Sequence, residues 1–132
     1  MAGERADVPG SVVRRSEAVC RLRPADPGQI IQATIVVRRP ADPGDIDAVA
    51  EFARRYGLKV LEASAPKRTV RVEGSAENMN RAFGTDLAYF GDDDGAYLSY
   101  DGSLSLDADV AGRVIAVLGL DQQPVARPRA RD

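Results

Sequence analysis

The stretch RTVRVEGSAENMNRAFGTDL, residues 68–87, carries more agreeing local signals than any other part of the chain. Its first part, Thr69–Val72, alternates polar with apolar residues and is rich in β-formers, which predicts a half-buried strand. Gly74 is expected to end that strand, because glycine weakens strands and favours turns. Residues 85–89 are expected to be extended again.

A short helix is predicted between these two extended segments. Ser75 is placed to cap its first turn through the side-chain hydroxyl. Met79, Ala82 and Phe83 recur at three- and four-residue spacing and form an apolar stripe, and Gly84 is expected to end the helix. A strand that leads directly into a helix has to fold that helix back onto a sheet. The stretch therefore predicts a two-layer α+β domain.

The rest of the chain repeats these patterns. Gln29–Arg39 is a strand rich in Ile, Val and Thr, and Asp42 is placed to cap a helix that starts at Pro43 and ends at Gly57. The first six elements follow the split βαβ order of ferredoxin-like folds. We therefore predict an α+β, ferredoxin-like sandwich, with an antiparallel sheet and two main helices on one face. The remaining predicted elements are strands over 58–64, 68–73, 87–90, 96–100, 103–106 and 114–118 and a small helix over 108–112, capped by Asp107.

Three segments are expected along the chain. Residues 1–28 form an extended arm, punctuated by prolines and glycines, for which no regular structure is predicted. Residues 29–121 form the α+β domain. Residues 122–132 form a flexible basic linker with two prolines and no apolar face.

The composition argues against most classes of function. The 132 residues carry a net charge of -2, which favours neither nucleic acid nor an anionic membrane as a partner. Histidine, the commonest general base and metal ligand, is absent. The one cysteine, Cys20, is interpreted as a small apolar residue. No apolar run is long enough to span a membrane, and the N-terminus has no signal-peptide pattern.

Candidate catalytic and metal-binding patterns are weak. Asp107 and Asp109 are typical of a helix start rather than of an acid–base pair. Asp92, Asp93 and Asp94 lack the alternate spacing of a calcium loop, so we interpret them as a hairpin tip and a candidate acidic contact patch for a basic partner. No cofactor, metal or catalytic residue is predicted, and the chain is expected not to be an enzyme. These residues alone predict a binding domain that acts through its surfaces.

Several passages resemble one family in order and spacing. The chain is similar to the activation prodomain of sedolisin, or serine-carboxyl, peptidases of the kumamolisin type. The passages are Pro9–Ser11, Ile35–Arg39, Val49–Val60 (VAEFARRYGLKV), Arg71–Leu87, Leu104–Leu106, Val110–Gly112 and Val114–Asp121.

This resemblance implies a fold related to subtilisin prodomains and a role as intramolecular chaperone and inhibitor of a sedolisin catalytic domain, in cis or in trans. It implies release of the prodomain at acidic pH, and a linker that crosses the active-site cleft. The catalytic Glu, Asp and Ser of the family and its calcium site have no counterpart among these residues, so the chain is expected to be a precursor fragment or a stand-alone prodomain. The family suggests secretion, although no export signal is visible. The linker residues are Gln122, Gln123, Pro124, Val125, Ala126, Arg127, Pro128 and Arg129.

Two alternatives remain open at this point: a free-standing ferredoxin-like binding or regulatory domain, and a trans-acting peptidase inhibitor. For acid release, the hypothesis is that carboxylates pair with arginines across the interface. Such pairs have lowered carboxylate pKa values in a complex, and their contribution to binding is lost as the pH falls through those values. The candidates are Glu73 and residues 92–94.

Overall fold

The computed structural model describes residues 4–15, 17–39, 43–93 and 95–123. None of the helices in these ranges is long and apolar enough to cross a membrane. The elements are β1 (Arg5–Asp7), β2 (Cys20–Pro24), β3 (Ile30–Val37), α1 (Pro43–Arg55), β4 (Lys59–Ser64), β5 (Thr69–Ser75), α2 (Ala76–Phe83), β6 (Ala88–Asp92), β7 (Gly95–Ser99), β8 (Ser105–Asp107), α3 (Ala108–Ala111) and β9 (Val114–Leu118).

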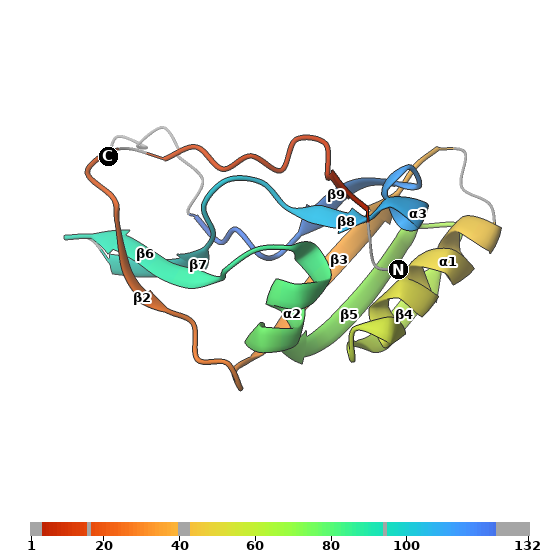
Figure 1. Cartoon of the computed structure of the whole chain (residues 1–132), viewed down its shortest axis with the longest axis horizontal. Helices are drawn as coiled ribbons and strands as arrows, with labels where there is room; N and C mark the ends of the chain where they lie inside the picture. The colour runs from red at the N-terminus through yellow and green to blue at the C-terminus, as the bar shows by residue number, and fades with distance from the viewer. Residues whose placement is uncertain (1–3, 16, 40–42, 94, 124–132) are drawn as a thin grey trace, which may run out of the picture.

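A four-stranded antiparallel sheet forms the centre of the fold, in the order β4–β5–β3–β9. Both α1 and α2 lie on the same side of this sheet (Figure 1). If the four strands are numbered along the chain, their order across the sheet is 2–3–1–4. This is the arrangement of the split βαβ fold. The predicted α+β, ferredoxin-like class is confirmed.

The core lies between the sheet and the two helices. Along β3, the residues Ile31, Ala33, Ile35 and Val37 are buried, while the residues between them are exposed or half-buried. This alternation follows from the two-residue period of a strand, which sends successive side chains to opposite faces. From the helices, Phe52 and Phe83 meet edge to face, with ring centroids 6.1 Å apart, and fill the space under β3 and β5.

The local structure of α2 follows its sequence closely. The Ser75 hydroxyl accepts a hydrogen bond from the Asn78 backbone N–H at 3.1 Å, and Gly84 ends the helix in the left-handed conformation at φ 61°. One expectation is wrong: β5 continues through Gly74 to Ser75 instead of ending at Gly74. A Cβ at Gly74 would approach Leu58 Cδ2 to 2.5 Å, so this glycine packs closely against the Leu58 side chain within a continuous strand and does not form a turn.

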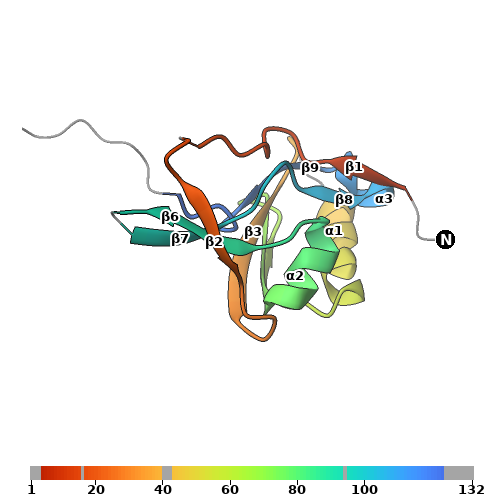
Figure 2. The same cartoon turned by 60° about the vertical axis from the view of Figure 1, so that its left-hand side comes forward.

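The N-terminal arm also departs from expectation, because it contains two strands. β1 pairs with β8, and β2 pairs with β6 to complete a three-stranded sheet, β2–β6–β7. Figure 2 shows this second sheet on the side of the molecule away from α1. Val8 and Ala25 are buried members of the core. The arm therefore contributes to packing, which its prolines and charges did not indicate.

Smaller differences concern the ends of elements. The expected cap of α1, Asp42, lies outside the described residues. The turn of the β6–β7 hairpin is shorter than predicted, since β6 extends to Asp92 and β7 begins at Gly95. Gly57 lies two residues after the end of α1 and has a positive φ of 79°. This conformation supports the predicted role of Gly57 at the end of the helix.

Candidate functional site: an open sheet face and the end of the described chain

The face of the central sheet opposite α1 and α2 is not covered by a helix among the described residues. Two large apolar side chains lie on it: Ile30 is 62% exposed and Leu118 is 55% exposed. Leu118 pairs across the sheet with Thr34, which shares its face with Ile30 because both are even-numbered residues of β3. We call this surface the open face. Its members include Ile30, Gln32, Thr34, Val36, Lys59, Glu62, Thr69, Arg71, Glu73 and Leu118.

Charged residues of both signs gather on the β4–β5 half of the open face. Glu62 lies 3.3 Å from Lys67 Nζ and 3.5 Å from Arg71 Nη1. The hydrogen bond from Lys67, and then the contact with Arg71, hold the pKa of the Glu62 carboxyl below its ordinary value. Nearby, Gln32 donates a hydrogen bond of 3.3 Å to Glu73. The open face is thus apolar towards β3 and β9 and mixed in charge towards β4.

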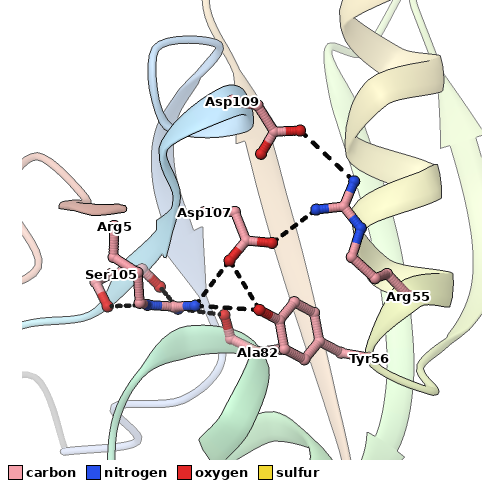
Figure 3. A network of polar contacts seen from close by, with 7 residues as sticks. All are labelled: Arg5, Arg55, Tyr56, Ala82, Ser105, Asp107 and Asp109. Atoms are coloured by element: carbon pink, nitrogen blue, oxygen red, sulfur yellow. Dashed lines mark hydrogen bonds and ion pairs between the residues drawn. The ribbon is translucent and has the colours of Figure 1, made fainter. Parts of the chain in front are cut away.

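A second cluster of polar groups lies where the ends of both helices meet β1 and β8 (Figure 3). Arg5 of β1 uses all five of its N–H donors there. It donates to the Ser105 hydroxyl and carbonyl, to the Tyr56 hydroxyl, to Asp107, and to the Ala82 carbonyl in the last turn of α2. The guanidinium therefore holds three elements together and also neutralises the negative end of α2.

Asp107 is the acceptor at the centre of this cluster. Its carboxylate accepts from Arg5 at 2.9 Å, from Arg55 at 2.7 Å and from the Tyr56 hydroxyl at 2.8 Å. Asp107 makes no side-chain capping hydrogen bond to α3, so the predicted capping role is wrong. The hydrogen bond to Asp107 raises the pKa of Arg55, and burial followed by the Asp107 hydrogen bond raises the pKa of Tyr56. The cluster contains no nucleophile beside a base, and its geometry is that of a structural link.

Asp45, at the start of α1, forms a third polar link. Its side chain is 0% exposed and accepts from Arg38 at 3.0 and 3.1 Å and from Arg113 at 2.6 Å. A buried carboxylate needs such donors, because desolvation penalises an unpaired charge. The three residues connect the end of β3, the start of α1 and the turn before β9.

The described part of the predicted linker is bound to the domain. The Gln122 N–H donates to the Leu98 carbonyl at 2.8 Å. The Gln123 side chain accepts from the Tyr97 hydroxyl at 3.0 Å and donates to the Arg14 carbonyl at 3.1 Å. The other predicted linker residues, Pro124, Val125, Ala126, Arg127, Pro128 and Arg129, lie outside the described residues.

The predicted acidic patch lies at the tip of the β6–β7 hairpin. Asp92 and Asp93 are exposed there, away from the open face, and Asp94 lies outside the described residues. Within the described ranges, no group of three or more carboxylate, thiol or imidazole side chains could hold a metal ion. Cys20, interpreted above as a small apolar residue, is exposed on β2.

A shallow hollow of about 350 Å³ lies between Arg21, Asp86 and the end of α2. Its charged groups are engaged with one another, since Arg21 contacts Asp86 at 3.0 Å and Asp101 contacts Arg15 at 2.7 Å. This hollow offers no set of convergent groups for chemistry or ligand binding.

Sequence reasoning missed Arg5, Arg15 and Asp45 as organising residues. Arg5 and Asp107 are 102 positions apart, and no local pattern connects residues at that separation. The sequence placed Asp45 in the first turn of a helix, where an acidic residue is favourable. It did not indicate that the Asp45 side chain would be buried. The arginine-rich arm gave no indication of which cations would be buried.

Comparison with known proteins places these observations in a family. The family model described as "Pro-kumamolisin, activation domain" matches residues 32–123. Kumamolisin from Bacillus sp. (strain MN-32) is 38% identical over 87 residues. That alignment covers 66% of this chain and 16% of kumamolisin, so the chain corresponds to a small part of the relative's length.

Proposed function

Because the chain belongs to the family of pro-kumamolisin activation domains, we propose that it binds and inhibits the catalytic domain of a kumamolisin-type sedolisin peptidase and assists the folding of that domain. Membership identifies residues 32–123 as a peptidase propeptide domain. The catalytic domain is proposed to lie either in cis, in the same longer precursor, or in trans, in a separate chain.

The uncovered face of the central sheet is the observation that carries this proposal. α1 and α2 bury one side of the sheet, and no helix among the described residues covers the other. Ile30 and Leu118 leave apolar area in water, which a partner surface would remove at a gain of about 25 cal/mol per Å². The mixed charges around Glu62 and Arg71 would lie at the rim and set the orientation.

Two further contacts belong to the same proposal. The segment after Asp121, predicted as the linker over residues 122–129, would lead towards the active-site cleft. The acidic hairpin tip, with Asp92 and Asp93, would meet a basic surface of the catalytic domain. The linker is supported by its basic sequence and the hairpin tip by the exposure and charge of Asp92 and Asp93.

The docking surface is tested by inhibition of a matched sedolisin catalytic domain. Replacing Ile30 or Leu118 by Ser should raise the inhibition constant about tenfold or more, since a buried large aliphatic side chain contributes about 1.5–3 kcal/mol. Leu22→Ser is the matched control, because Leu22 is similarly exposed, at 50%, but lies on β2. Equal inhibition by the wild type and both open-face variants, or equal weakening by Leu22→Ser, would contradict this assignment.

Release in acid is tested by the same assay as a function of pH. Protonation removes the charge of carboxylates at the interface, so their attraction to basic groups of the partner is present near neutrality and is lost in acid. The inhibition constant should rise between about pH 7 and about pH 3, across the ordinary carboxyl range. A constant value over this interval would show that carboxylates of the interface do not control release.

A further inference from the structure

The N-terminal residues 4–15 lie along the connection between β7 and β8, and we call them the strap. Backbone hydrogen bonds join the Val8 N–H to the Leu104 carbonyl at 2.9 Å and the Val13 N–H to the Gly102 carbonyl at 3.0 Å. The buried Tyr100 hydroxyl donates to the Ser11 carbonyl at 2.7 Å. Figure 1 shows the strap in orange and red beside this connection.

Arg15 holds the far end of the strap. Its guanidinium donates to Asp101 at 2.7 Å, to the Tyr100 carbonyl at 2.7 Å and to the Ser99 hydroxyl at 3.1 Å. Its Cζ lies 3.9 Å from the centroid of the Phe90 ring. Only 13% of the side chain is exposed. One long side chain of the strap is thus buried between the end of β7 and β6.

The exit segment, residues 119–123, uses the same end of β7. The Ser99 hydroxyl donates to Asp121 at 2.8 Å. Because Arg15 can only donate, it occupies the acceptor side of that hydroxyl and directs its proton towards Asp121. Arg15, Ser99 and Asp121 therefore form a directed chain of hydrogen bonds, in which a charged donor and a charged acceptor strengthen both links.

One more hydrogen bond connects the strap with the exit segment. Gln123 donates its side-chain N–H to the Arg14 carbonyl of the strap. A groove of about 220 Å³ separates the two segments, with Gly10, Ser11, Val12 and Val13 on one side and Gly119 and Asp121 on the other. The C-terminal part of the strap and the exit segment therefore lie side by side, although about 100 residues of chain lie between them.

We propose that the strap, through Arg15 and Ser99, holds the exit segment on β7, and that loosening the strap frees the exit segment. The coupling is reciprocal, because each segment supplies one end of the same hydrogen-bonded chain. This inference deepens the proposed function and rests on it in one respect: in a propeptide, the chain after Gln123 connects to the catalytic domain. The strap would then control where that connection leaves the domain.

Hydrogen–deuterium exchange on the chain alone tests the proposal. Arg15→Gln should speed exchange of the Gln122 N–H, which is bonded to Leu98, about tenfold or more, with β3 and β5 unchanged. Arg21→Gln removes an exposed ion pair with Asp86 and is the matched control, which should leave the exit segment unchanged. Unchanged exchange at Gln122 in Arg15→Gln, or an equal increase throughout the domain, would overturn the proposal.

A second variant keeps the test decisive if Arg15→Gln does not fold. Ser99→Ala leaves Arg15 its contacts with Asp101 and the Tyr100 carbonyl but removes the link to Asp121. The exit segment should again exchange faster, and Asp121→Ala should speed exchange of the Val13 N–H in the strap. If exchange of the exit segment were unchanged in Ser99→Ala and exchange of the strap were unchanged in Asp121→Ala, the coupling would be refuted. These readouts need no peptidase, so they fail or succeed independently of the proposed inhibition.

Discussion

Replacing Asp107 by Ala should destabilise the domain by about 3 kcal/mol, because three donors lose their common acceptor. The partly buried Tyr56 hydroxyl would lose the carboxylate to which it donates a hydrogen bond. Arg5 would keep its other four hydrogen bonds but lose its only ionic partner among the described residues. Arg55 would retain the weaker contact with Asp109 at 3.5 Å.

The magnitude follows from how far each contact is exposed. The side chains of Asp107 and Arg5 are 19% and 28% exposed, so their charge-assisted bond is weighted at about 1.5 kcal/mol. The Tyr56 bond contributes about 1 kcal/mol. Arg55 is 43% exposed, and screening by solvent limits its pair to about 0.5 kcal/mol. For a domain of this size, a loss of about 3 kcal/mol lowers the melting temperature by roughly 10 °C.

Urea unfolding followed by far-UV circular dichroism measures this loss. Asp109→Ala is the control, because Asp109 is 63% exposed and its removal should cost less than about 0.5 kcal/mol. A double-mutant cycle with Arg5→Ala should give a coupling energy of about 1 kcal/mol or more between Arg5 and Asp107. If Asp107→Ala were no more destabilising than Asp109→Ala, or if the coupling were zero, the cluster would not be the structural link argued above.

Three further variants test other parts of the structure. Burial raises the pKa of Tyr100 to about 12, above its unfolded value near 10. The free energy of unfolding is therefore fully present below about pH 10 and falls by no more than about 3 kcal/mol as the pH rises towards 12. Tyr100→Phe should flatten this alkaline loss in urea titrations, and an unchanged slope would contradict it. In Gly91→Ala the new Cβ would overlap the Gly95 carbonyl oxygen, which should cost about 2 kcal/mol or more, whereas Gly112→Ala, with open space around it, should change the urea midpoint little. Lys67 and then Arg71 lower the pKa of Glu62. The contribution of Glu62 to stability is therefore present above the unfolded carboxyl pKa and is lost as the pH falls through the lower folded pKa. The small difference in urea midpoint between wild type and Glu62→Gln should disappear by about pH 3, and persistence of that difference would refute the assignment.

The regular elements of the fold were readable because their signals are local. The alternation along β3 and the cap, stripe and terminal glycine of α2 each lie within a few residues. Gly74 shows where local reading fails. The same glycine is consistent with a strand end or with close packing, and only the position of Leu58, the residue before β4, decides between them.

The surface that carries the proposed function was predictable only in part. That one sheet face would be free follows from two helices on the other, which the order of elements indicates. The strap was not predictable, because its strength comes from arginines whose partners are far away in sequence. Arg15 and its acceptors are separated by 84–86 positions, and nothing in the segment around Arg15 distinguishes it from Arg14, whose side chain is exposed. Charge was visible in the sequence, but burial of that charge was not.

β9 is the element through which these surfaces meet. Leu118, its last residue, lies on the open face, and the exit segment begins at the next position with Gly119, whose φ of 105° turns the chain towards β7. A Cβ at Gly119 would approach the Gln32 carbonyl oxygen to 2.9 Å, so this turn is packed directly against β3. A partner that covers Leu118 would therefore contact the chain only one residue before the segment that the strap holds. Docking on the open face and release of the exit segment are consequently expected to influence each other, with Gly119 as the short and sterically constrained connection between them.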